Sequence, residues 1–156
     1  VSGGGDRYPS GAVVDSPADE PAGSLIDWFE MNPLSKTGAT IVVFALAAYT
    51  LAVVPEQRRR RVTPRVLLFL TVGVLLDVTA TVFMILGSSK DAFTLHGVLG
   101  YSSLAAMIVD TGLMWRLATS AGPNADVPRA LHLYTRVAYL WWVAAFITGG
   151  LLVAMR

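Results

Sequence analysis

The chain has 156 residues, of which 54% are hydrophobic, and its formal net charge at pH 7 is +1. This composition is too apolar for an ordinary soluble domain, and so small a net charge gives no indication of nucleic-acid binding. The absence of cysteine excludes disulfides, zinc–thiolate sites, iron–sulfur clusters and thiol catalysis. The sequence therefore predicts an all-α, integral membrane protein.

The N-terminal part of the chain differs in composition from the rest. Residues 1–24 are rich in Gly, Ser, Pro and acidic residues, which predicts a disordered, acidic arm that does not contribute to a core. Residues 25–33 carry apolar and aromatic side chains directly before the first long apolar run. We expect them to form a short interfacial helix at the level of the lipid headgroups.

Four continuous apolar runs follow, each about as long as a helix that crosses a ~30 Å hydrocarbon core. They predict a four-transmembrane-helix bundle within residues 34–156. The expected helices span residues 34–54, 65–87, 93–117 and 130–154. The segments between them contain Pro, Gly or charged residues that end a helix.

The distribution of arginine predicts the orientation of the bundle. Arginines are concentrated between the first two runs and flank the segment between the last two. The positive-inside rule places these segments in the cytoplasm. We therefore expect a multi-pass protein of the cell (inner) membrane, with both termini extracytoplasmic and the lipid bilayer as its surroundings. The arginine run is also suited to contact anionic lipid.

Charged residues inside the predicted spans are costly unless they are paired. Counted at 1.5 Å per residue, Asp110 and Arg136 lie at similar depths on neighbouring helices, so we expect an ion pair between them. Asp77 lies on the second run, one helical turn before Thr81. It can accept a hydrogen bond from Thr81, share Arg136 or retain its proton. The sequence predicts that these four residues form a buried polar layer, with a proton path as the alternative.

On the fourth run, helical spacing predicts one interior face. It comprises His132, Arg136, Tyr139, Val143 and Phe146. Trp141, Trp142 and Phe146 are also candidates for contact with lipid or with neighbouring helices, and we expect lipid contact.

The two histidines begin different runs. His96 begins the third and His132 the fourth, which places them near opposite membrane faces, roughly 25–30 Å apart. They cannot both bind one heme iron. No set of three ligands suggests a zinc site. For each histidine we expect hydrogen bonding near the membrane surface, with ligation as the alternative role.

Three stretches together resemble a known family: "LLFLTVGVLLDVTATVFM", "FTLHGVLGYSSLAAMIVDTGLMW" and "ALHLYTRVAYLWWVAAFITG". Over roughly residues 45–152 the chain resembles the heme-sequestering, HsmA-like family of small four-helix membrane proteins. The resemblance implies a heme-related function, with heme b as the cofactor and His96 and His132 as candidate ligands. It also implies a further histidine where this chain has Asp110, and here the chain departs from the family pattern.

The sequence contains no nucleophile–base constellation and no glycine-rich phosphate loop before a helix, so we predict a protein that is not an enzyme. Two functions are open. One is binding or sequestration of heme. The other is that of a cofactor-free accessory subunit of a larger respiratory or photosynthetic complex, docked through its helices and its N-terminal arm. A small transporter is a third alternative, but neither repeats nor broken helices support it.

Overall fold

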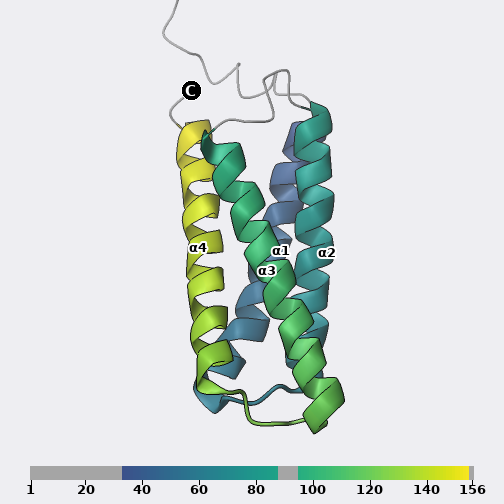
Figure 1. Cartoon of the computed structure of the whole chain (residues 1–156). Coiled ribbons are helices and arrows are strands. Elements are labelled where there is room, and N and C mark those ends of the chain that lie inside the picture. Colours follow the sequence, from purple (N-terminus) through teal and green to yellow (C-terminus); the bar gives the residue numbers. More distant parts are fainter. Residues whose placement is uncertain (1–32, 88–94, 155–156) are drawn as a thin grey trace, which may run out of the picture.

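The structure, a computed structural model, describes residues 33–87 and 95–154, which form a bundle of long helices (Figure 1). The helices are α1 (Pro33–Arg59), α2 (Pro64–Gly87), α3 (Leu95–Ala121) and α4 (Arg129–Ala154). Each is long and apolar enough to cross a membrane, which confirms the predicted all-α fold with four membrane-length helices. The predicted arm, and the predicted interfacial segment apart from Pro33, lie outside the described residues.

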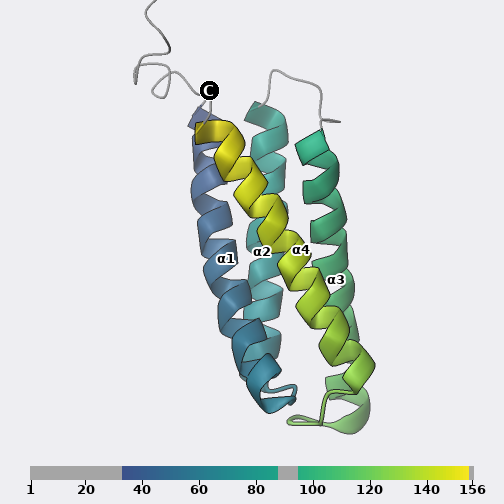
Figure 2. The same cartoon turned by 90° about the vertical axis from the view of Figure 1, so that its left-hand side faces the viewer.

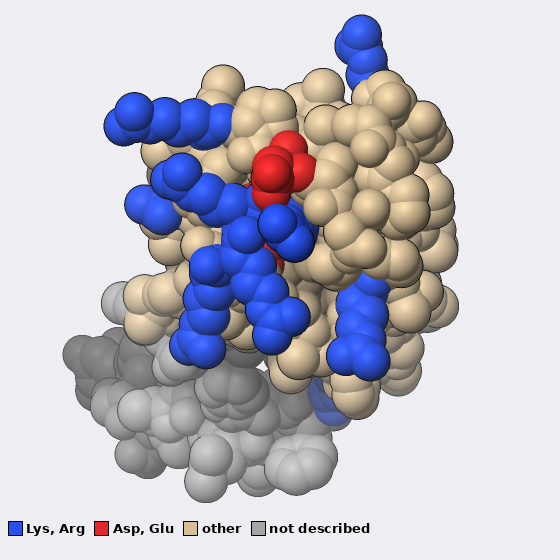
Figure 3. Space-filling view, turned by 90° about the horizontal axis from the view of Figure 1, so that it is seen from below, with Lys and Arg blue, Asp and Glu red and all other residues tan. Residues whose placement is uncertain are grey.

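Successive helices run in opposite directions and form a closed ring. α1 contacts α2 and α4, and α3 likewise contacts α2 and α4 (Figures 1 and 2). One end of the bundle, where α1 and α3 end, carries most of the described basic side chains (Figure 3). We call it the arginine end, and it is defined by Arg58, Arg59, Arg60, Arg61, Arg65, Arg116 and Arg129.

Local sequence signals set the helix boundaries at this end. Thr63 caps α2, because its hydroxyl accepts a hydrogen bond from the backbone N–H of Val66 at 3.3 Å, and Pro64 occupies the first helical position. α3 ends before Gly122, whose φ of 89° is typical of a glycine that terminates a helix. The backbone N–H of Gly122 bonds the carbonyl of Ala118 at 3.0 Å.

α1 continues beyond its predicted end. The prediction ended this helix at Val54 because Pro55 follows, but the helix passes through Pro55 and ends at Arg59. Proline removes only one backbone hydrogen bond, and packing against neighbouring helices can compensate for the loss. As a result Glu56 and Gln57, expected in a loop, belong to the last turn of α1.

The two connecting segments at the arginine end pair with each other. The backbone N–H of Val62 bonds the carbonyl of Ala125 at 3.0 Å, and the N–H of Val127 bonds the carbonyl of Arg60 at 2.8 Å. Val62 and Val127 are buried beneath these segments and join the core. This pairing connects the α1–α2 half of the bundle to the α3–α4 half.

The core is a column of small, aliphatic and aromatic side chains between the four helices. α1 contributes residues spaced three and four apart, including Ala45, Tyr49 and Ala52, as expected for one helical face. Gly73 of α2 lies against the ring of Tyr49, because a Cβ at this position would be 2.5 Å from two ring carbons. The close approach fixes Tyr49 in the centre of the bundle.

Candidate functional site

Asp77 lies near the middle of α2 and is buried among the four helices. Its Oδ2 accepts two hydrogen bonds, one from the Nε1–H of Trp142 at 2.6 Å and one from the hydroxyl of Tyr49 at 3.3 Å. The carboxyl group is therefore held by side chains of α1 and α4. Oδ1 accepts no hydrogen bond from the described residues.

The partners of Asp77 differ from those predicted. Thr81 donates no hydrogen bond to it, and Trp142, which we expected to face lipid, is only 3% exposed. The indole ring makes an edge-on contact with Tyr49, with ring centroids 5.0 Å apart, and stacks with Phe146 at 5.8 Å. Aromatic contacts of this kind add to the gain from burial. Trp141, its neighbour in sequence, is exposed as expected.

A cavity of about 410 Å³ lies beside Asp77, between it and the end of the bundle opposite the arginine end. All four helices contribute to its wall. We call this cavity the Asp77 cavity. Apolar and glycine residues make up most of the lining: Ala39, Val42, Val43, Ala80, Met84, Gly100, Trp142, Ala145, Phe146, Gly149 and Gly150. The polar lining is limited to Asp77, Thr81, His96 and Ser103. An apolar pocket with a few placed polar groups is the usual form of a small-molecule site.

His96 also lines the Asp77 cavity, from the first turn of α3. Its ring packs against the α4 backbone at Gly149, where a Cβ would lie 2.7 Å from Cε1 and 2.9 Å from Nε2. A residue with a side chain at this position would displace the ring. Nδ1 is buried without a hydrogen-bond partner among the described residues. Sequence reasoning did not connect His96 with Asp77, since they lie on different helices.

The second buried acid, Asp110, has a different environment. It is fully buried, and its Oδ1 accepts a hydrogen bond from the hydroxyl of Thr135 at 2.6 Å. Its Oδ2 has no partner among the described residues. Asp110 does not line the Asp77 cavity.

The predicted ion pair between Asp110 and Arg136 is wrong. The side chain of Arg136 is exposed, and its Nε–H donates to Oε1 of Gln57 at 2.9 Å. The inward face of α4 is rotated relative to the prediction. Its buried residues are His132, Thr135, Ala138, Trp142 and Ala145. A threonine hydroxyl thus reaches Asp110, while the long arginine side chain extends to a more polar surrounding.

His132 belongs to a polar cluster at the arginine end. Its Nδ1 lies 2.9 Å from Oε1 of Glu56, which is fully buried in the last turn of α1. Gln57 donates from Nε2 to the carbonyl oxygen of His132 at 3.0 Å and accepts from Arg136. This Glu56–His132 cluster connects α1 to α4. His132 lines neither of the two cavities described here and is at the other end of the bundle from His96.

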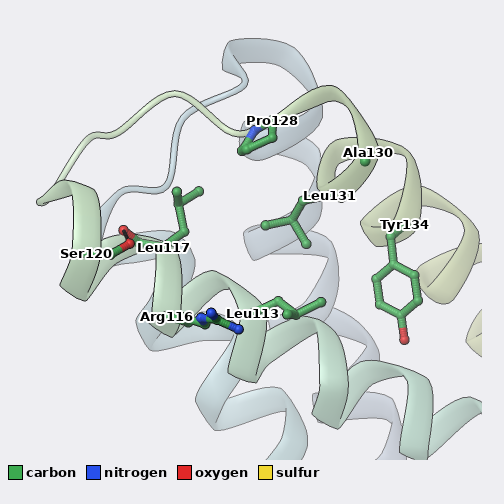
Figure 4. A pocket seen from close by; sticks show the side chains of 8 residues that line it. All are labelled: Leu113, Arg116, Leu117, Ser120, Pro128, Ala130, Leu131 and Tyr134. Carbon is green, nitrogen blue, oxygen red and sulfur yellow. Dashed lines mark hydrogen bonds between the residues drawn. The ribbon is translucent and has the colours of Figure 1, made fainter.

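A second cavity, of about 540 Å³, opens between α3 and α4 at the arginine end (Figure 4). We call it the α3–α4 groove. Its lining consists of Leu113, Arg116, Leu117, Ser120, Pro128, Ala130, Leu131 and Tyr134. The hydroxyl of Tyr134 donates to the carbonyl of Ala106 at 3.2 Å and so holds the two helices together on one side of the groove.

Sequence reasoning missed five side chains that bond the buried charges: Tyr49, Glu56, Gln57, Thr135 and Trp142. One signal was present for Glu56. It lies seven residues after Tyr49, and residues seven apart share one helical face. If the helix continues through Pro55, this spacing places Glu56 on the same buried face as Tyr49.

Comparisons of the chain with protein families, with curated proteins and with solved structures gave no match. Within the described ranges, no three His, Asp or Glu side chains are grouped so that they could hold a metal ion. The site is therefore characterised by its own geometry: an apolar cavity inside a four-helix bundle, lined by a carboxyl group whose Oδ1 accepts no hydrogen bond from the described residues.

Proposed function

We propose that this protein is a non-enzymatic membrane protein that binds a small, largely apolar molecule in the Asp77 cavity. One observation carries the proposal. Asp77 lines an apolar cavity and is held in place through Oδ2 by Tyr49 and Trp142. Its other carboxyl oxygen, Oδ1, accepts no hydrogen bond from the described residues. A carboxyl group kept in such surroundings usually has a partner or a function.

The lining indicates the chemistry of the ligand. Aromatic and aliphatic side chains favour an apolar body, and Asp77 favours a hydrogen-bond donor or a cationic group on that body. The stacked rings of Trp142 and Phe146 form part of the wall and would contact a flat or cationic group favourably. Thr81, Ser103 and His96 provide further polar contacts.

Heme b is the second candidate ligand, since the HsmA-like resemblance implies it. His96 is the histidine that supports this candidate, because it lines the cavity and its Nδ1 has no hydrogen-bond partner among the described residues. His132 does not fit the role of an axial ligand in this site, because its ring lines neither cavity. If bound, heme would supply an iron centre and His96 would be its one histidine ligand.

The first test is a matched pair of glycine substitutions on α3. Gly100 lines the Asp77 cavity and Gly112 does not, and a Cβ at either position meets nothing within 4 Å. We expect Gly100→Leu to fill the cavity and abolish retention of the bound molecule, while Gly112→Leu retains it. The measurement is mass spectrometry of small molecules released from gently solubilised, purified protein, with an absorption spectrum for heme.

Two further variants distinguish the ligands. A heme signal that is lost in His96→Ala and kept in Asp77→Asn would identify heme. A colourless molecule lost in Asp77→Asn would identify a donor or cationic ligand. If Gly100→Leu and Gly112→Leu release the same molecules in the same amounts as the wild type, the Asp77 cavity is not the binding site.

The orientation in the cell membrane is also a proposal. The arginine end is expected in the cytoplasm by the positive-inside rule, and the Asp77 cavity then lies in the outer half of the bilayer. A cofactor-free accessory subunit of a larger complex stays the alternative function. It predicts stable co-purification with larger membrane proteins and no small molecule in the cavity.

A further inference from the structure

The α3–α4 groove combines an apolar wall with unneutralised positive charge. Leu117 and Leu131 face each other from α3 and α4, and Arg116 lies beside Leu117 on the same helix (Figure 4). Arg129 stands between two further lining residues at the start of α4. Both arginines are exposed, and neither guanidinium group makes a hydrogen bond or ion pair with a described residue.

No described acidic residue nearby is available to neutralise them. At the arginine end, the described acids are Glu56 and Asp126. Glu56 is buried and bonded to His132, and Asp126 is bonded to Arg61 at 3.2 Å. The groove therefore has a positive rim and an apolar floor, at a helix end where the membrane surface is expected.

We propose that the α3–α4 groove binds an anionic phospholipid of the surrounding membrane. One acyl chain lies along the leucines between α3 and α4, and the phosphate lies between Arg116 and Arg129. Basic pockets between membrane helices favour anionic headgroups, and arginine suits phosphate because its guanidinium group donates two parallel hydrogen bonds. The lipid would fill the gap that the two crossing helices leave between their ends.

The test compares two double variants that remove the same charge from the same end. Arg116→Gln with Arg129→Gln removes the rim of the groove, and Arg58→Gln with Arg59→Gln, on the last turn of α1, is the control. Native mass spectrometry of purified protein would measure binding of phosphatidylglycerol and of phosphatidylcholine with the same acyl chains. We expect the wild type and the control to prefer phosphatidylglycerol, and the rim variant to lose about 25-fold in affinity, about fivefold for each arginine.

Two further measurements keep the proposal open to refutation. Ala130→Trp, at an exposed position that lines the groove, should displace the acyl chain and lower phosphatidylglycerol binding without removing charge. Inorganic phosphate should not displace the lipid. An equal loss of phosphatidylglycerol affinity in the two double variants would show diffuse attraction only. Displacement of the lipid by phosphate would show a simple anion site. Unchanged lipid binding in Ala130→Trp would exclude the groove. Each of these results overturns the proposal.

Discussion

The two buried aspartates among the described residues differ in what their second carboxyl oxygen meets. Asp77 and Asp110 each have one oxygen bonded by side chains of the protein. Asp77 lines a cavity, so its remaining oxygen can meet a ligand. The remaining oxygen of Asp110 is buried without a described partner, and the residue contributes to neither cavity. We therefore propose a binding role for Asp77 and a packing role for Asp110.

This assignment gives a prediction about α4. Thr135→Val keeps the shape of the side chain and removes the hydroxyl that bonds Asp110, so it should destabilise the bundle by about 1–3 kcal/mol. Arg136→Leu removes an exposed contact to Gln57 and should cost about 1 kcal/mol or less. Unfolding of the two variants in mixed detergent would measure both changes. A larger loss of stability in Arg136→Leu than in Thr135→Val would instead support the ion pair between Asp110 and Arg136.

At the level of the elements, the last turn of α1 holds the bundle together at the arginine end. Pro55 did not stop the helix, and the turn that follows it places Glu56 against His132 of α4. Gln57 adds a hydrogen bond to the α4 backbone. A buried pair of this kind is costly to break on one side only, because the remaining partner is left without a bond.

A double-mutant cycle tests this connection. Glu56→Leu and His132→Leu should each be strongly destabilising, by about 3–5 kcal/mol when one partner is left buried and unpaired. The double variant should cost clearly less than the sum, with a coupling energy of about 1–3 kcal/mol in detergent unfolding. The control cycle uses the exposed pair Arg61 and Asp126, for which we expect coupling below about 1 kcal/mol. Equal coupling in both cycles would contradict the structural role of Glu56.

The sequence predicts the four helices well but not the face that each helix turns inward, and the apolar character of the helices explains the difference. Apolar length gave four helices, because any helix that crosses lipid must satisfy its backbone internally and remain apolar over its length. Which face of each helix points inward was harder to predict, since all faces of such a helix are apolar. On α4 the prediction placed Arg136 opposite Asp110, whereas the residue before it, Thr135, faces Asp110. The Asp77 cavity needed side chains from all four helices and was not predictable from spacing within any one of them.

At the scale of the whole molecule, the two ends of the bundle have different chemistry. The arginine end is closed by paired connecting segments and carries the Glu56–His132 cluster and the α3–α4 groove. The Asp77 cavity lies toward the other end, where Lys36 is the one described basic residue apart from His96. We therefore propose that a ligand reaches Asp77 from the side of the membrane opposite the arginines.

The orientation that this requires can be measured directly, because the chain has no cysteine and any introduced thiol is the only one. We expect Leu34→Cys, in the first turn of α1, to react with a membrane-impermeant maleimide on intact cells. Asn124→Cys, in the connecting segment at the arginine end, should react only after the cells are opened. The reverse pattern would place the Asp77 cavity on the cytoplasmic side, so that its ligand would have to come from the cytoplasm. Labelling of both on intact cells would mean that the bundle is inserted in both orientations.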